Sequence, residues 1–217
     1  MVGNDAPLFT YSVTIQNHQA YGYGKYDERP APVPLSVSVS DGAMEQLSVY
    51  MEGVRDSSEM LVALTQYLDA LDEPTVLVFF GDHRPNLGTA CTELGLRYNL
   101  NETPQETVDT YAVPYVIWSN EAYASAVDLP ARYAALALPE NGYLSDNYLG
   151  AMVLQLIGYH GQSAFFDELN ALRAELPVLR EREATYCLAD GTYTDTLPPE
   201  LAAAVSRLHK WTYYLLK

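Results

Sequence analysis

The sequence lacks several features that would assign a function at once. No apolar run reaches the roughly 18 residues that a membrane-spanning helix needs, so we expect no span within the chain. The first residues lack the basic and apolar regions of a signal peptide. The only cysteines, Cys91 and Cys187, are too few for a disulfide framework and do not have metal-ligand spacing. Two free thiols are the favoured interpretation, and a disulfide between them stays open for an oxidising compartment.

Positive charge is also scarce. Lysine and arginine number 12 against 28 aspartates and glutamates, which gives a formal net charge of −16. Because phosphate contacts dominate the affinity for nucleic acid, this balance argues against nucleic acid as a partner. It also opposes unassisted docking on anionic lipid. An anionic substrate would therefore need a bound metal or a few local cations.

Well-known catalytic motifs are missing as well. The chain has no Gly-x-Ser-x-Gly elbow, no phosphate-binding P-loop and no Gly-x-Gly-x-x-Gly after a strand. No serine or threonine is marked out as a nucleophile. The sequence alone therefore assigns no catalytic residue.

What the sequence does contain indicates a globular α/β protein. Hydrophobic residues make up 48% and charged residues 18%, a composition typical of a packed core. Apolar residues recur at three- and four-residue steps from residue 41 to about residue 72, which predicts a long amphipathic helix with Asp41 as its N-cap. The apolar, β-rich run 75–80 follows directly. A long helix before such a strand is typical of a mostly parallel sheet sandwiched between helices.

Further elements follow from the same reasoning. Residues 8–15 and 111–118 have the composition of strands, and Pro114 places the second at a sheet edge or bulge. The Asp-Gly step at 190–191 is a hairpin signal. The other predicted elements are a short helix near 90–94 in a long loop over 84–107, helices at 147–157 and 165–176, a hairpin of 185–188 with 192–194, and a terminal helix over 198–216.

The most informative stretch is the end of the strand predicted at 75–80, where Gly81 is followed by Asp82 and His83. In open α/β sheets, ligands gather beyond the carboxyl ends of the strands. A carboxylate and a neutral imidazole together suit a divalent ion such as zinc or manganese. The alternative is an aspartate that caps the next turn beside an exposed histidine. Two ligands are also fewer than the three or more of a catalytic zinc-type site.

Two further residues are candidates for binding substrate. His18 follows the predicted strand 8–15, so two strand ends could each present an imidazole to one cleft. An imidazole there could bind or polarise a phosphate oxygen. Arg84, next to His83, could grip an anionic group with its guanidinium, or could pair with a surface carboxylate instead.

Several blocks together resemble the lipoteichoic acid synthase-like phosphoglycerol transferases of the sulfatase and alkaline phosphatase superfamily. The most specific block is Thr-Val-Leu-Val-Phe-Phe-Gly-Asp-His-Arg-Pro at 75–85. The others are Val-Thr-Ile-Gln-Asn-His-Gln-Ala-Tyr at 13–21, Tyr-Ala-Val-Pro-Tyr-Val-Ile-Trp-Ser-Asn at 111–120, and two later segments at 143–151 and 172–179. The resemblance implies an alkaline phosphatase-type fold. Residues 1–180 would be the C-terminal part of the catalytic domain, with 181–217 as a hairpin and helix packed on it.

The resemblance also implies roles for individual residues. Asp82 and His83 would ligate a divalent metal, manganese or magnesium, with zinc or calcium as alternatives. His18 would contact the substrate phosphate, while no family role transfers to Arg84. The remaining ligands, a glutamate and the nucleophilic threonine, would lie upstream of Met1, and so would the membrane helices. We therefore expect a fragment of a membrane-anchored bacterial enzyme whose domain lies on the extracellular face.

Two functions remain open at this point. The first is a metal-dependent phosphoglycerol transferase or sulfatase-like enzyme that acts on phosphate or sulfate esters such as lipid head groups, with the fragment inactive alone. The alternative is a stand-alone, non-catalytic binding or assembly module with the same fold. A plain sulfatase would need a modifiable cysteine or serine in the missing part. A half-domain would leave a bare strand edge, so we also expect the fragment to form homo-oligomers.

Overall fold

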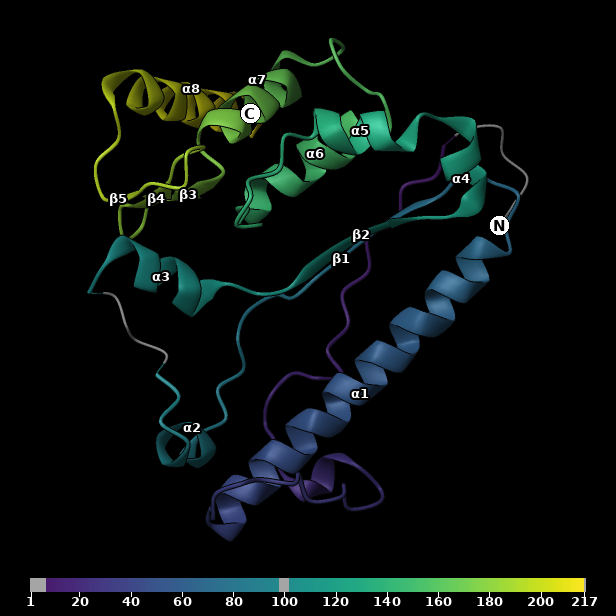
Figure 1. The fold of residues 1–217 in the computed structure, drawn as a ribbon, viewed down its shortest axis with the longest axis vertical. Coiled ribbons are helices and arrows are strands. Elements are labelled where there is room, and N and C mark those ends of the chain that lie inside the picture. The colour runs from purple at the N-terminus through teal and green to yellow at the C-terminus, as the bar shows by residue number, and fades with distance from the viewer. Residues whose placement is uncertain (1–6, 98–101, 217) are drawn as a thin grey trace. The chain divides into compact units, whose positions relative to one another are not determined.

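The computed structural model describes residues 7–97 and 102–216, in two compact units (Figure 1). The first unit comprises residues up to Leu64 together with Pro85–Leu96, and the second comprises Thr65–Arg84 together with the residues from Arg97 onward. Helix α1 (Asp41–Asp69) begins in the first unit and ends in the second. The class is α/β, as predicted, with helices predominating over strands.

The first unit is organised around α1. The predicted amphipathic pattern is confirmed, because Ala43, Leu47 and Val49 are buried on one face of the helix. The N-terminal cap lies one residue earlier than expected: the Ser40 hydroxyl accepts a hydrogen bond from the Ala43 N–H at 3.2 Å. The predicted short helix is also present as α2 (Thr89–Glu93), and a short 3₁₀ helix, η1, spans Tyr23–Lys25.

The predicted strand at 8–15 is wrong. These residues form no strand, and the large side chains of Leu8, Phe9, Tyr11, Val13 and Ile15 are between 67% and 84% exposed. The β-rich composition is real, but an isolated strand has no ladder partner for its backbone groups. The segment is therefore extended chain without a sheet.

In the second unit, β1 (Val76–Phe80) pairs with β2 (Tyr115–Ser119), and both strands were predicted. The pairing is antiparallel, with Val78 opposite Ile117. Every strand pair among the described residues is antiparallel, so the expectation of a mostly parallel sheet is wrong for these strands. The helix-then-strand pattern predicts a parallel sheet only where an earlier strand lies alongside, and the 8–15 segment is no strand.

Asn120 fastens the start of β1 to the end of β2. The side chain is fully buried, and its Oδ1 accepts from the backbone N–H of Thr75 at 2.9 Å and of Tyr123 at 3.0 Å. Its Nδ2 donates to the carbonyls of Leu68 and Glu73. One side chain thus closes the end of α1, the start of β1 and the N-terminus of α4 (Glu121–Ala126).

The rest of the second unit is mainly helical. Between β1 and β2 lies α3 (Pro104–Tyr111), a helix that was predicted as loop and strand, and its start carries a complete capping box of Thr103 and Glu106. The helices that follow are α5 (Leu129–Ala135), η2 (Asp146–Tyr148), α6 (Leu149–Leu156), α7 (Ala164–Glu175) and α8 (Pro199–Leu215). Leu169, Leu172 and Val205 form the core between α7 and α8.

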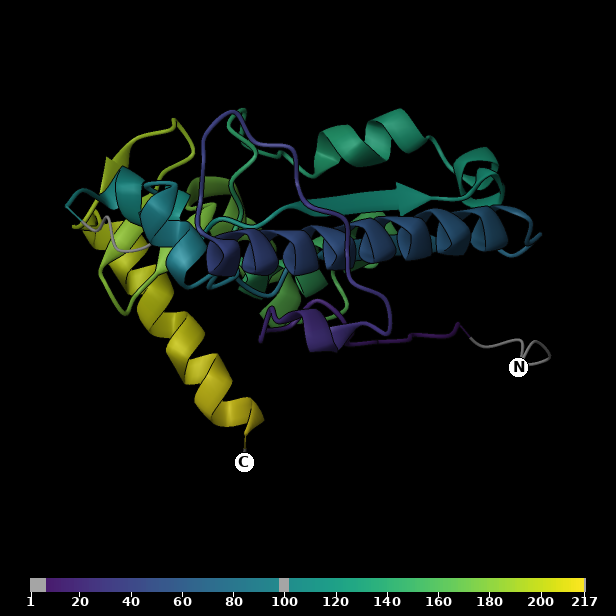
Figure 2. The same ribbon diagram turned by 90° about the horizontal axis from the view of Figure 1, so that it is seen from below.

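A three-stranded antiparallel sheet completes this unit, with β3 (Val178–Arg180), β4 (Thr185–Cys187) and β5 (Tyr193–Thr194) in that order. The predicted hairpin between β4 and β5 is confirmed, and Gly191 in its turn has a φ of 83°. The predicted boundary after residue 180 falls between β3 and β4, which pair with each other. The C-terminal end of α8 projects from the second unit in Figure 2.

A buried arginine ties several of these helices together. Arg173 on α7 is 2% exposed, and its guanidinium donates to the Leu136 carbonyl at the end of α5 and to Gln155 Oε1 at 2.8 Å. The carbonyl end of a helix carries partial negative charge, which offsets the buried cation. Burial lowers the pKa of Arg173.

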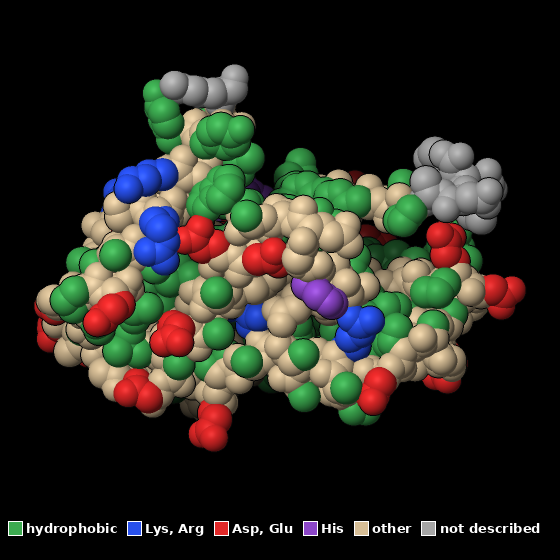
Figure 3. Space-filling view, turned by 90° about the horizontal axis from the view of Figure 1, so that it is seen from above, with side chains coloured by type: hydrophobic (Ala, Val, Ile, Leu, Met, Phe, Trp, Pro, Cys, Tyr) green, Lys and Arg blue, Asp and Glu red, His purple; other side chains and the backbone are tan. Residues whose placement is uncertain are grey.

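Two features of the structure agree with the composition. Carboxylate side chains are scattered over the face drawn in Figure 3, which is consistent with a net charge of −16. Among the described residues, no helix combines the length and the apolar character that crossing a membrane demands.

Candidate functional site

The strand end at Gly81 presents the predicted metal ligands. The Gly81 N–H donates to the Pro114 carbonyl at 3.0 Å, which extends the β1–β2 contact by one residue. A Cβ at residue 81 would lie 3.1 Å from the Val113 Cβ, so the glycine lets the end of β1 and the segment before β2 approach closely. Directly after it, the side chains of Asp82 and His83 are 93% and 58% exposed. The strand therefore ends by placing both groups in solvent.

The two side chains face each other. His83 Nε2 lies 3.5 Å from Asp82 Oδ2, while His83 Nδ1 lies 2.9 Å from the Arg84 carbonyl oxygen. A carbonyl oxygen can only accept, so Nδ1 carries a proton, and Nε2 is the ring nitrogen that faces the carboxylate. Metal-binding histidines commonly use this arrangement, in which a second hydrogen bond fixes the ring and its tautomer.

The pair fits one edge of a metal site. Nitrogen and oxygen ligands lie ~2.1 Å from a zinc-type ion, which puts two tetrahedral neighbours roughly 3.4 Å apart. The observed separation of 3.5 Å between Nε2 and Oδ2 matches that edge without rearrangement. Within residues 7–97 and 102–216, no group of three or more His, Cys, Asp or Glu side chains could hold a metal ion. The described part of the chain thus offers two candidate ligands, Asp82 and His83.

Arg84 is anchored beside this pair. Its Nε donates to the Ala112 carbonyl at 3.2 Å, and the guanidinium is otherwise exposed. A second polar pair, Tyr143 and Asp109, is close enough for the charge of Arg84 to act on it: the Tyr143 hydroxyl donates to Asp109 Oδ1 at 2.6 Å. This hydrogen bond, together with burial, raises the pKa of Tyr143 to about 12, and Arg84 opposes the shift.

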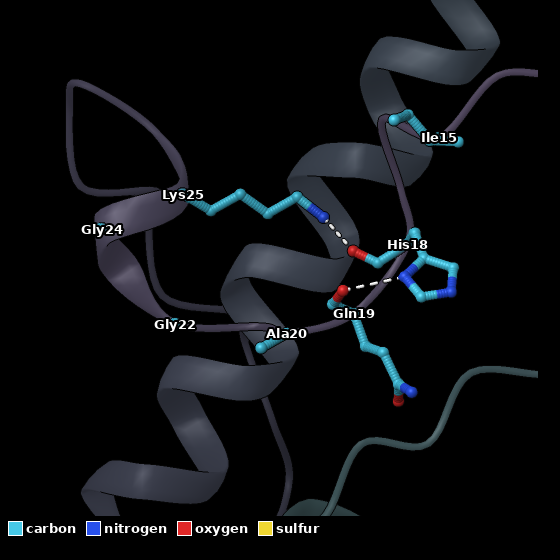
Figure 4. A pocket seen from close by; sticks show the side chains of 7 residues that line it. All are labelled: Ile15, His18, Gln19, Ala20, Gly22, Gly24 and Lys25. Carbon is cyan, nitrogen blue, oxygen red and sulfur yellow. Dashed lines mark hydrogen bonds between the residues drawn. The ribbon is translucent and has the colours of Figure 1, made fainter.

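His18 lies in the first unit, in the loop that follows residues 8–15. Its Nδ1 is 2.9 Å from the Gln19 carbonyl oxygen, which mirrors the way His83 is held. The loop lines a shallow cavity of about 650 Å³ that is largely open to solvent (Figure 4). The lining residues are Ile15, His18, Gln19, Ala20, Gly22, Gly24 and Lys25.

Gly53 on α1 sets the position of this loop. A Cβ at residue 53 would lie 2.6 Å from the Asn17 Cγ and would overlap its Oδ1, so any larger residue requires the Asn17 side chain to move. The Tyr21 hydroxyl donates to the Asn17 carbonyl at 3.1 Å, and Gln16 Nε2 donates to Asp56 Oδ2 of α1 at 2.8 Å. Gln16, before His18, is therefore bonded to the helix, while the Tyr21 contact closes the loop on itself.

The structure brings together Asp82, His83 and Arg84 in the second unit, while His18 belongs to the first. Sequence reasoning missed Lys25, Gly53 and the Asp109–Tyr143 pair. A glycine in the middle of an amphipathic helix was a usable signal for Gly53, since it costs helix stability unless something packs there. The pairing of Asp109 with Tyr143 is long-range and leaves no local pattern.

The comparison with known protein families gives the class of the chain. The sulfatase family profile matches residues 2–159, which is more than half of the sequence, so the chain belongs to the sulfatase family. The matched region contains His18, Asp82, His83 and Arg84.

A curated protein is similar as well. The "Putative cyclic beta-1,2-glucan modification protein" of Rhizobium meliloti (strain 1021) is 26% identical over 151 residues, which is 66% of this chain and 23% of the relative. The chain therefore spans less than a quarter of the length of that relative. No solved structure matches the chain.

Proposed function

We propose that this chain is part of a metal-dependent enzyme of the lipoteichoic acid synthase-like branch of the sulfatase superfamily. It would act on phosphate or sulfate esters, with phosphoglycerol transfer as the preferred reaction, on the outer face of a bacterial cell membrane. The observation that carries this proposal is the facing pair of Asp82 Oδ2 and His83 Nε2 at the end of β1, inside the family match.

Each site residue has a role in this proposal. Asp82 and His83 hold a manganese or magnesium ion, which supplies Lewis-acid stabilisation of the charge on the ester oxygens. Arg84 binds a non-bridging oxygen of the ester, because its guanidinium donates hydrogen bonds to anions and is already oriented by the Ala112 carbonyl. His18, in the first unit, donates a hydrogen bond to a phosphate or sulfate group.

The relative's name bears on the acceptor. That protein is described as a modifier of a cyclic glucan. If the likeness extends to substrate, a glucan would be the molecule that is modified here, and we propose one of its hydroxyls as the acceptor. Cyclic and linear glucans are therefore suitable acceptors for an assay with the complete protein.

A non-catalytic binding module is the second candidate. It is favoured by the presence of only two ligands and no assigned nucleophile in the described residues. On the first proposal, the 217-residue chain alone has little or no turnover, because the further ligand and the nucleophile are supplied by other residues of the complete enzyme. Robust phosphodiesterase activity of this chain with manganese, dependent on Asp82, would contradict that inactivity.

Manganese binding to the 217-residue chain tests the site directly. We expect Mn²⁺ to broaden the nuclear magnetic resonance signals of His83, and we expect Asp82→Asn or His83→Gln to weaken binding about tenfold or more. His209 and Glu181 form a matched control, since they are another exposed histidine–carboxylate pair, with Nε2 and Oε1 2.7 Å apart. Broadening centred on His209, or binding that survives Asp82→Asn, would overturn the proposal.

We also propose that the chain self-associates through residues 8–15. Phe9, Tyr11, Val13 and Ile15 alternate with smaller residues and are at least 67% exposed, so an extended backbone carries one apolar face with no sheet partner. Light scattering across a dilution series should show dimers or larger species. Val13→Lys should shift the population toward monomer, since a charge on a strand edge blocks pairing. A monomer at every concentration of the unsubstituted chain would count against it.

A further inference from the structure

The cavity beside His18 has an unusual lining for so acidic a protein. Of its seven lining residues, only His18 and Lys25 have ionisable side chains, and both can carry positive charge. No carboxylate lines it, although aspartate and glutamate outnumber lysine and arginine 28 to 12 in the chain. Two carboxylates of α1 are bound to this loop: Glu45 accepts from the Tyr23 N–H at 2.7 Å, and Asp56 accepts from Gln16 Nε2 at 2.8 Å. Neither is among the lining residues.

Lys25 is held at the cavity by two contacts. Its ammonium donates to the backbone carbonyl of His18, and it lies 5.3 Å from the centroid of the Tyr21 ring. The first contact ties the cation to the residue that carries the imidazole, and the second is a cation–π contact. Figure 4 shows the Lys25 chain extended across the loop toward His18. One of the three ammonium donors is used by the carbonyl, which leaves donors for a ligand.

The surrounding loop favours a ligand with several oxygens. Gly22 and Gly24 line the cavity without side chains, so the backbone is accessible there. The cavity is widely open to solvent, so an ester with its attached group can enter it as readily as a bare oxyanion. Partial burial lowers the pKa of Lys25, which a bound anion would reverse.

From these contacts we propose that Lys25 is a substrate-binding residue: with His18, it binds the tetrahedral oxyanion of a phosphate or sulfate ester in this cavity. The inference rests on the proposed function, because the oxyanion is the ester group of that substrate. It adds a residue and a ligand site, and it does not involve the metal ligands. In a chain of net charge −16, this local cation is what makes approach of an anion favourable.

The test is titration of the 217-residue chain with glycerol 1-phosphate, inorganic phosphate and inorganic sulfate, without metal. Amide signals of residues 15–25 report the site. We expect Lys25→Met to raise the dissociation constant about tenfold or more, and Lys25→Arg to stay within about threefold of the unsubstituted chain. The phosphate and sulfate arms decide which ester the cavity prefers, and the glycerol arm shows whether the attached group adds affinity.

Arg55→Met is the matched control, because Arg55 is also a cation of the first unit but pairs with Glu52 and Glu59 on α1 outside the cavity. We expect its dissociation constants to stay unchanged. Equal weakening by both variants would overturn the proposal, since it would mean diffuse electrostatics. No shift of the 15–25 signals in the unsubstituted chain, or unchanged binding by Lys25→Met, would also overturn it. Circular dichroism of each variant checks that the fold is retained, and Lys25→Gln gives a second neutral variant.

The outcome is separable from that of the metal test. Lys25-dependent anion binding without manganese binding at Asp82 would support the cavity and refute the enzymatic proposal. Manganese binding with no anion in the cavity would do the reverse. In the complete enzyme, Lys25→Met should raise KM far more than it lowers kcat, because the residue contributes to binding of the substrate.

Discussion

The two loops that carry the candidate imidazoles are built in different ways. The loop at Asp82 and His83 continues a paired strand, and its first residue still donates a ladder-like hydrogen bond to Pro114. The loop at His18 follows a segment with no strand partner and is positioned by contacts with α1, above all at Gly53. Backbone pairing therefore fixes one imidazole, while side-chain packing on a helix fixes the other. The two should respond to different substitutions.

The largest effect is expected from Asn120→Ala, which removes the side chain that joins the ends of β1 and β2. Its loss leaves the Thr75 and Tyr123 N–H groups and several carbonyls without their partner, at a cost of about 3 kcal/mol of unfolding free energy. Urea denaturation measures this change. Manganese affinity at Asp82 should fall, while anion binding at Lys25 should persist. If Asn120→Ala abolished both manganese binding and anion binding, the two loops would not be stabilised independently.

Gly81→Val should have the next largest effect. The added side chain meets Val113, whose Cβ would be 3.1 Å from the new Cβ, so β1 and the chain before β2 must separate at a cost of about 2 kcal/mol. We expect weaker manganese binding and a lower urea midpoint. Gly24→Val is the control, because a Cβ at residue 24 would meet nothing within 4 Å. An unchanged midpoint for Gly81→Val would show that the close approach is not required.

Gly53→Ala tests the other loop, and its two consequences have opposite signs. Alanine favours the interior of α1 by up to about 1 kcal/mol over glycine, yet its Cβ displaces Asn17 and with it the His18 loop. We expect a small net change in stability, altered amide signals over 15–25 and weaker anion binding. Manganese binding should be unaffected. Stronger or equal anion binding would mean that the loop does not depend on Gly53.

The smallest effect is a pH dependence at Tyr143. Its pKa is raised to about 12 in the fold by Asp109 and burial, from an ordinary value of 10.0, so the protonated phenol is favoured in the folded state. The stabilisation is present below pH 10 and is lost as the pH rises from about 10 to 12. Tyr143→Phe should cost about 1 kcal/mol at pH 8, and the difference from the unsubstituted chain should shrink above pH 10. A pH-independent difference would contradict the Asp109 contact.

Much of the helical structure could be predicted from the sequence, because it depends on patterns of neighbouring residues. The periodicity behind α1, the Asp-Gly turn before β5 and the apolar run of β1 each act over a few residues. The start of α3 also carried a local signal, Thr103 and Pro104 followed by Glu106, which went unused. Strand direction and the fate of residues 8–15 depend on distant partners and could not be read locally.

In the candidate site, too, some residues could be predicted from the sequence and others could not. Asp82 and His83 were found because they directly follow a strand and a glycine. That Nε2 and Oδ2 face each other at 3.5 Å depends on the His83 ring orientation, which the carbonyl of the next residue, Arg84, sets and which residue types alone do not give. Lys25 gave no signal, since a lone lysine in a Tyr- and Gly-rich loop resembles any surface residue. Only the fold places its ammonium on the His18 carbonyl.

The burial of both native thiols has a practical consequence. Cys91 is 7% exposed and Cys187 is fully buried, and both are free. Maleimide reagents will therefore spare them in the folded chain, so the natural sequence already serves as an unreactive background. A single cysteine introduced at exposed Gln19 could carry a spin label or fluorophore that reports directly on ligand entry beside His18.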